Sequence, residues 1–203
     1  MSAVSIMQQA LGAQWDTLAP ALKAHYMTAG NRDIGVLSIE YPKWMQWPLN
    51  FLRLFGTLIN QQAQDTPTQV SKRMLGEQQV WQRRVELPKQ VMSFDSVWQY
   101  CGGNELIEYV KPYLGLKMAV TVHEGKLYYA GRAYILKIGK LRLPIPEALV
   151  LGHTTIEEIG IDAEHFTMDF RLQHPIFGQI YRYSGRFRTE LEAEFPASLP
   201  VRH

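Results

Sequence analysis

Residues 165–188 read HFTMDFRLQHPIFGQIYRYSGRFR, and this stretch predicts two β-strands joined by a short turn. Its first half alternates apolar and polar side chains: Phe166, Met168, Phe170 and Leu172 against Thr167, Asp169, Arg171 and Gln173. A period of two places such sets on opposite faces of a strand. Pro175 and Gly178 bracket the turn. The return arm has one apolar face, interrupted by a glycine: Tyr181, Tyr183, Gly185 and Phe187.

The same alternation continues upstream, between punctuating Gly, Pro and Asn residues. It predicts strands over residues 35–41, 70–75, 79–87, 91–101, 105–111, 116–123, 126–138 and 153–161. A polar break is expected over residues 65–68, and another at Pro144 and Pro146, because proline donates no hydrogen bond to a sheet. Residues 6–26 carry apolar side chains at helical intervals and predict two short helices, the second opened by Pro20.

Short connections between neighbouring strands favour antiparallel pairing, since parallel strands need long crossovers. The predicted fold class is therefore α+β, with a large curved antiparallel sheet, half-barrel or barrel-like, and N-terminal helices packed against it. Whether the sheet closes stays open at this point. We expect residues 1–190 to form one sheet-rich domain and residues 191–203 to form a poorly ordered polar tail.

Composition limits the class of protein. Hydrophobic residues make up 46% of the chain and charged residues 20%, as in a folded domain rather than a disordered or membrane-spanning chain. The net charge of +2 is small and its basic residues are dispersed, so no nucleic-acid partner is expected. A single cysteine, Cys101, and a start without a signal-peptide pattern favour the cytoplasm.

No motif for nucleotide binding, zinc proteolysis or serine hydrolysis occurs in the chain. The six histidines lack the spacing of metal ligands, so no metal is expected. Without a nucleotide-binding motif, no other cofactor is expected either. Cys101 lies among strand residues, which favours a buried, inert thiol over a nucleophile.

The most hydrophobic stretch covers residues 44–59, WMQWPLNFLRLFGTLI, with apolar side chains at helical spacing. It is too short to cross a bilayer and Arg53 interrupts it, so no transmembrane segment is expected. One interpretation is a helix packed on the sheet. The other is an interfacial helix, or a lid over an apolar cavity, which would suit Trp44 and Trp47 and would leave peripheral membrane contact open.

Several charged residues interrupt apolar strands: Arg83, Glu108, Arg132, Glu157 and Asp169. If they share an interior, each charge must be paired or hydrated, and the cluster could bind a ligand headgroup. The alternative is that they decorate the solvated face of a one-sided sheet. Tyrosines at strand positions, such as Tyr134 and Tyr183, leave the same choice between core and pocket wall.

A set of turn and packing residues is recognisable as a group: residues 18–25, residues 81–83, Gly139 with residues 143–146, Glu157 and, most specific of all, residues 166–185 with HPIFG at 174–178. In these residues the sequence resembles the bacterial domain of unknown function 4166 family. The resemblance implies a shared fold more strongly than a shared activity. It also implies family features at His25, Arg83, Glu108, Glu157 and Tyr183, without an assigned role for any of them. Family members occur alone or behind NAD-binding oxidoreductase-like domains, which implies an accessory or ligand-presenting role.

Three hypotheses follow. The first is a non-catalytic binding module for a lipid-like or other amphipathic small molecule, in which Phe51 and Phe55 line the cover and Arg83 or Arg132 holds an acidic headgroup. Its full predicted site is Phe51, Phe55, Arg83, Glu108, Arg132, Tyr134, Glu157 and Tyr183. The second is an interaction domain acting with a separate oxidoreductase-like protein. The third is an enzyme that pairs His25 or His174 with a carboxylate.

Overall fold

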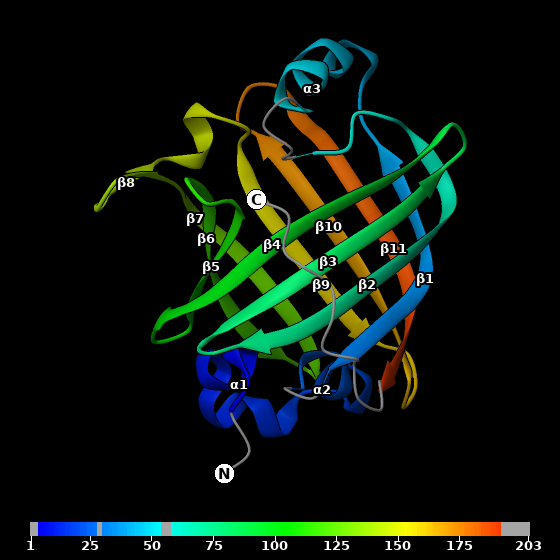
Figure 1. Cartoon of the computed structure of the whole chain (residues 1–203), viewed down its shortest axis with the longest axis vertical. Coiled ribbons are helices and arrows are strands. Elements are labelled where there is room, and N and C mark those ends of the chain that lie inside the picture. Colours follow the sequence, from blue (N-terminus) through cyan, green and yellow to red (C-terminus); the bar gives the residue numbers. More distant parts are fainter. Residues whose placement is uncertain (1–3, 28–29, 54–57, 192–203) are drawn as a thin grey trace.

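The computed structural model describes residues 4–27, 30–53 and 58–191, and the alternating segments of the sequence form strands there (Figure 1). The strands are β1 (Asn31–Glu40), β2 (Ala63–Leu75), β3 (Gln78–Leu87), β4 (Gln90–Gly102), β5 (Glu105–Lys111), β6 (Leu114–His123), β7 (Lys126–Ile138), β8 (Leu141–Ile145), β9 (His153–Gly160), β10 (His165–His174) and β11 (Gly178–Leu191). Each pairs antiparallel with its neighbours.

The sheet closes on itself. Strands β6 to β1 pair in reverse chain order, and β1 pairs with β11, which continues through β10 and β9 to β7. An additional pairing of β6 with β7 completes a ten-stranded barrel, while β8 pairs only with β7 and lies outside it. Closure removes the exposed strand edges that an open sheet would leave. The structure therefore resolves the predicted choice between half-barrel and barrel in favour of a closed barrel.

Short helices lie at both ends of the barrel (Figure 1). At one end are α1 (Ile6–Leu11), the 3-10 helix η1 (Gly12–Thr17) and α2 (Pro20–Tyr26). At the other are η2 (Lys43–Met45) and α3 (Gln46–Leu52), with η4 (Glu147–Leu149) between β8 and β9. Helix α2 packs closely on the sheet because Gly160 of β9 has no side chain: a Cβ there would lie 2.6 Å from the Cβ of Ala19.

The hairpin β10–β11 confirms the pattern in residues 165–188. Phe166 pairs with Phe187 and Phe170 with Tyr183 across the two strands. The apolar side chains of both strands face the barrel interior, where Phe166, Phe170 and Tyr181 are buried. The rings of Phe170 and Tyr183 stack at a centroid distance of 4.4 Å. The strands predicted from alternation are thus barrel strands, each with one face towards the barrel interior and one towards the outside.

Several local predictions differ from the structure. Residues 65–68 belong to β2 rather than to a break, because Thr66 and Thr68 are buried on its inner face and continue the alternation with polar side chains. Pro144 lies within β8, which pairs on one side only and therefore tolerates a residue without an N–H. Cys101, expected to be buried, is exposed near the end of β4.

Within the stretch of residues 44–59, residues 44–45 belong to η2 and residues 46–52 form α3, while residues 54–57 lie outside the described ranges. Leu49 is buried, whereas Trp47 on the same helix is 83% exposed. In the described residues no helix is both long enough and apolar enough to cross a membrane. Of the predicted polar tail, only the backbone of Leu191, the last residue of β11, is described, and residues 192–203 lie outside the described ranges.

Candidate functional site

The barrel encloses a cavity of about 230 Å³ that runs between its two ends. Most of its wall is apolar or aromatic, with contributions from all ten barrel strands and from Ile145 at the end of the outlying strand β8. The wall includes Leu37, Val85, Phe94, Trp98 and Phe170. A concave, mostly apolar space with a few polar groups is the usual form of a small-molecule site.

At the α2 end of the cavity, three buried side chains from three elements meet. Lys72 of β2 donates from Nζ to Asp33 Oδ2 of β1 at 2.6 Å and to the carbonyl oxygen of His25 at 2.7 Å. His25 Nδ1 lies 2.6 Å from the same ammonium and 2.9 Å from Asp33 Oδ2. Thr189 of β11 donates to the other oxygen of Asp33 at 2.8 Å. His25 and Asp33 line the cavity, so this cluster forms its polar floor.

Burial and pairing set the charges of this cluster. Burial lowers the pKa of His25 to about 4, because its neighbour Asp33 only partly offsets the loss of solvent. Burial also lowers the pKa of Lys72, while it would raise that of Asp33. The charges and hydrogen bonds of His25 and Lys72 outweigh burial at Asp33 and hold its pKa below the usual range. At neutral pH the cluster therefore contains one ion pair and a neutral imidazole.

A second buried group lies beside it. The hydroxyl of Tyr26 in α2 donates to the Glu158 carboxyl group of β9, with the two oxygens at 2.9 and 2.7 Å, and also hydrogen-bonds with the hydroxyl of Tyr129 in β7. Burial raises the pKa of Glu158 to about 8, so its carboxyl group is mostly protonated at neutral pH. This network ties α2 to the sheet without adding a net charge to the cavity.

A third polar group lies on the wall formed by β3, β4 and β5. Arg83 donates to Glu108 Oε1 at 2.8 Å and to Ser96 Oγ at 2.7 Å, and Ser96 donates to the same Glu108 oxygen at 2.7 Å. The guanidinium carbon lies 5.0 Å from the ring centre of Trp81 and 5.5 Å from that of Phe94. Both charged side chains are only 15% exposed. The Arg83 guanidinium is therefore neutralised by Glu108 and shielded from water, and it is not a free cation.

Two polar atoms of the cavity wall have no hydrogen-bond partner within the described part of the chain: His25 Nε2 and Trp98 Nε1. Both side chains are 3% exposed. Their rings flank the same two neighbours, Tyr26 and Trp81. Buried polar atoms are nearly always paired in folded proteins, so an unpaired one indicates a missing partner.

The opposite end of the cavity is apolar. Leu52 of α3, Leu58 and Leu151 line it there, and none of the three is fully buried. Val150, next to η4, also lines the cavity and is 43% exposed. The cavity thus comes close to solvent at Val150. Helix α3 lies at the end of the barrel opposite to α2 (Figure 1).

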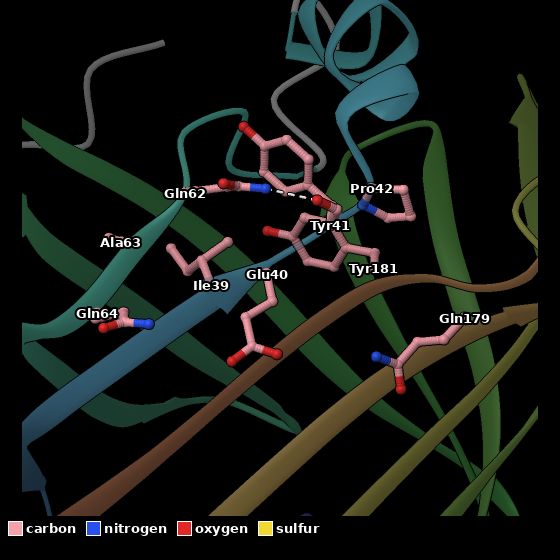
Figure 2. Close-up of a pocket in the computed structure, with 9 residues that line it drawn as sticks. All are labelled: Ile39, Glu40, Tyr41, Pro42, Gln62, Ala63, Gln64, Gln179 and Tyr181. Carbon is pink, nitrogen blue, oxygen red and sulfur yellow. Dashed lines mark hydrogen bonds between the residues drawn. The ribbon is translucent and has the colours of Figure 1, made fainter.

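A second depression of about 540 Å³ lies between the ends of β1, β2 and β11 (Figure 2), and Tyr181 lines both it and the interior cavity. Four of its side chains are polar: Glu40, Gln62, Gln64 and Gln179. Figure 2 shows the Gln62 amide directed at the backbone of Tyr41, where it donates to the carbonyl oxygen at 2.5 Å. In the described ranges no buried polar atom of this depression lacks a partner, unlike in the interior cavity.

The structure brings half of the predicted site together. Arg83, Glu108, Tyr134 and Tyr183 all line the interior cavity. The other described members lie elsewhere: Phe51 is 61% exposed on α3, Arg132 is exposed, and Glu157 hydrogen-bonds with Tyr128 at 3.1 Å outside the cavity wall. Phe55 lies outside the described residues. The charged residue that β9 turns inward is Glu158, the neighbour of the predicted Glu157.

Two histidines were candidates for pairing with a carboxylate. His25 meets Asp33 in the cavity wall. His174 lies on the β10–β11 turn, where its Nδ1 accepts from the backbone N–H of Ile176 at 3.2 Å. In the described part of the chain, no three His, Cys, Asp or Glu side chains are grouped so that they could hold a metal ion.

Sequence reasoning missed Asp33, Lys72, Trp98 and Glu158 as cavity or floor residues. A signal existed for one pair: Glu157 and Glu158 are adjacent in a strand, so one of them had to face inward. For Asp33 and Lys72 no local signal existed, because both are charged residues at the ends of alternating strands, where solvent exposure is the ordinary expectation.

Comparison with known proteins gives one match. No curated protein and no solved structure matches the chain. A family model described as "Domain of unknown function (DUF4166)" matches residues 18–187. The match begins at Leu18, two residues before α2, and ends at Phe187 in β11. The match includes β1 to β10, most of β11 and all three polar groups of the cavity apart from Thr189. The chain therefore belongs to the DUF4166 family.

Proposed function

We propose that the barrel binds a small apolar or amphipathic molecule in its interior cavity. The observation that carries the proposal is the cavity itself, an apolar space of about 230 Å³ with polar groups gathered at one end. An apolar cavity of about 150 Å³ in a protein core is large enough to bind benzene. The barrel can therefore hold a molecule somewhat larger than one aromatic ring.

Binding is favoured over acid–base catalysis by the state of His25. Its geometry resembles that of a general base, because Nδ1 lies next to a carboxylate and Nε2 is free at the cavity wall. A general base works best when its pKa is near the working pH, and burial lowers the pKa of His25 to about 4. The imidazole is thus better suited to hold a ligand than to remove a proton.

The ligand reaches the cavity from the α3 end. The α2 end is closed by buried helix residues and by hydrogen bonds between helix and sheet. At the α3 end the lining side chains are partly exposed, and Val150 lies at the surface. Exposed aromatic side chains on α3, such as Trp47 and Phe51, give an apolar molecule a favourable surface outside the barrel.

Calorimetric titration with cumene, a hydrocarbon of suitable size, tests the proposal. We expect saturable one-to-one binding to the purified protein. Val85 is fully buried and lines the cavity, so Val85→Phe fills part of the space and should weaken binding by about tenfold or more. Native mass spectrometry of freshly purified protein should in addition show a bound small molecule of cellular origin.

The matched control is Val91→Phe, the same substitution at a position of the adjoining strand β4 that is 53% exposed. It should leave cumene affinity within about twofold of the starting protein, because it changes no cavity atom. Absence of cumene binding, or equal weakening by both variants, would contradict an interior binding site.

A second candidate function is that of an interaction domain for an oxidoreductase-like protein. It is favoured by the exposed apolar side chains at the α3 end, where Trp47 is accompanied by Phe51, Ile176 and Phe177. If this surface mediates a complex, tagged protein should recover a specific NAD-binding protein and Trp47→Ser should not. Recovery of the same protein by both forms would remove the α3 surface as the contact.

A further inference from the structure

Two observations about the cavity define what kind of ligand it fits, given the binding function proposed above. The first is that its charged groups are already paired. Arg83 is bonded to Glu108, and Asp33 is bonded to Lys72. An anionic ligand would need a free cation, and in the described residues the cavity wall offers none. An ionised ligand would also lose its hydration without compensation.

The second observation is that the two unpartnered atoms are both hydrogen-bond donors. The indole Nε1 of Trp98 can only donate. The Lys72 ammonium has three protons, and three acceptors lie within reach: Asp33 Oδ2, the carbonyl oxygen of His25 and His25 Nδ1. A charged ammonium can only donate, so the Nδ1 atom 2.6 Å from it is assigned as an acceptor, and the neutral imidazole then carries its own proton on Nε2. That Nε2–H lacks an acceptor within the described residues.

The two donors belong to one part of the cavity. The His25 ring centre lies 4.2 Å from that of Tyr26 and 5.5 Å from that of Trp81. The Trp98 ring centre lies 6.4 and 4.6 Å from the same two rings. Both donors therefore lie beside one aromatic pair at the α2 end, and an oxygen, which has two lone pairs, can accept from each donor that it reaches there.

We infer that the ligand is an uncharged carbonyl compound of roughly ten non-hydrogen atoms, whose oxygen accepts hydrogen bonds from His25 Nε2 and Trp98 Nε1. Its apolar part extends along the aromatic wall towards α3, past Phe94 and Phe170. The size follows from the cavity, which is about one and a half times the volume that accommodates benzene. This class differs from an anionic amphiphile held by an arginine.

Three probes of equal size test the inference by calorimetric titration at neutral pH: acetophenone, cumene and benzoate. They present a ketone, a hydrocarbon and an anion to the same cavity. Acetophenone should bind about tenfold more tightly than cumene, although cumene is the more hydrophobic, and benzoate should bind most weakly. The carbonyl stretching band of acetophenone should also shift to lower wavenumber on binding, because its oxygen accepts two hydrogen bonds.

Two tryptophan variants locate the effect. Trp98→Phe removes the unpartnered N–H and should bring the affinity ratio of acetophenone to cumene to within about threefold of one. Trp81→Phe is the matched control, since Trp81 also lines the cavity but already donates to Gln79 Oε1 at 3.1 Å. It should leave the preference for the ketone in place.

The outcomes separate this inference from the proposed function. If none of the three probes binds, both fail. If cumene binds as tightly as acetophenone, or benzoate binds most tightly, the cavity is a binding site and the inferred ligand class is wrong. A preference for acetophenone that survives Trp98→Phe also overturns the inference, as does a carbonyl stretching band that does not shift on binding. The band is measured on the unsubstituted protein, so this second test does not depend on the folding of a variant.

Discussion

The two ends of the barrel are closed in opposite ways. At the α2 end, the buried side chains include charged and hydroxyl groups, and nearly all of them are bonded between helix and sheet. At the α3 end, the helix keeps one apolar side chain, Leu49, in the core and turns Trp47 and Phe51 outward. The first end resembles the interior of a domain, and the second resembles a surface made for contact.

This difference shows how a closed barrel can be stable and still admit a ligand. A buried ion pair contributes little net stability, but losing one partner is severe because the other charge stays buried. Such groups fix the position of α2 and the shape of the floor. The α3 end also has side-chain hydrogen bonds, from Gln46 to Asn50 and to the carbonyl oxygen of Asn60, but these lie largely at the surface, where water can take the place of a lost partner. Its side chains can therefore rearrange at a lower cost than the buried ion pair.

The largest expected effect is at the α2 end. Asp33→Ala leaves the Lys72 ammonium buried without its carboxylate and should lower the free energy of unfolding by about 3–5 kcal/mol, measured by urea denaturation. Arg188→Ala is the control, because its pair with Glu164 is 2.9 Å long but exposed, and it should cost less than about 1 kcal/mol.

The double variant Asp33→Leu with Lys72→Met separates charge from packing. It removes both charges together and should recover part of the lost stability. Equal losses in the single and double variants would indicate that the floor is held by packing alone, and the contrast between the two ends would then lose its electrostatic basis.

The sequence predicted the strands that form the cavity wall better than the charged cluster that forms the cavity floor. Alternation identified the strands of the barrel and the hairpin of residues 165–188. It did not show closure, because closure depends on the pairing of β6 with β7 and of β1 with β11, and alternation is the same in an open sheet. The ion pair of the floor joins residues 39 positions apart, and no local pattern reports such a contact.

The candidate site was predictable only where polar residues interrupt apolar strands. Arg83 and Glu108 were found in this way and do line the cavity. Arg132 and Glu157 have the same pattern but lie on the outer face or away from the cavity wall. The pattern identifies interrupted strands, while the choice of face depends on register, which pairing with neighbouring strands determines.

The next largest expected effect is on stability, and it tests whether helix α3 unfolds together with the barrel or independently of it. Leu49 is fully buried, and Leu49→Ala should lower the free energy of unfolding by about 2–5 kcal/mol in urea denaturation. The loss follows from removing buried methyl groups and leaving a void. A loss below about 1 kcal/mol would mean that α3 unfolds independently of the barrel, and the two ends would differ more than the buried side chain suggests.

A smaller effect depends on pH. Burial raises the folded pKa of Glu158 to about 8, above the ordinary value of 4.5, so the folded state holds one more proton between these values. Stability from this group is therefore fully present below the lower value and is lost as the pH rises to the higher one. Glu158→Gln removes that loss. Its stability relative to the starting protein should rise by about 1.4 kcal/mol from pH 6 to pH 7.

Glu157→Gln is the control for this pH dependence, because Glu157 is the adjacent residue on the other face of β9 and bonds to Tyr128. Urea denaturation at each pH gives both differences. If the two variants show the same change with pH, the Glu158 carboxyl group is not held neutral by burial, and the floor would then carry a net negative charge.

The smallest expected effect is at the α3 surface. Trp47 is 83% exposed, and Trp47→Ala should change the free energy of unfolding by less than about 0.5 kcal/mol, in contrast to Leu49→Ala on the same helix. If the exposed ring guides ligands to the cavity, stopped-flow mixing with acetophenone should show slower association with an unchanged equilibrium constant. Unchanged association would place the ligand's path away from Trp47, whereas a large loss of stability would show that this end of the barrel is held together by the side chains it exposes.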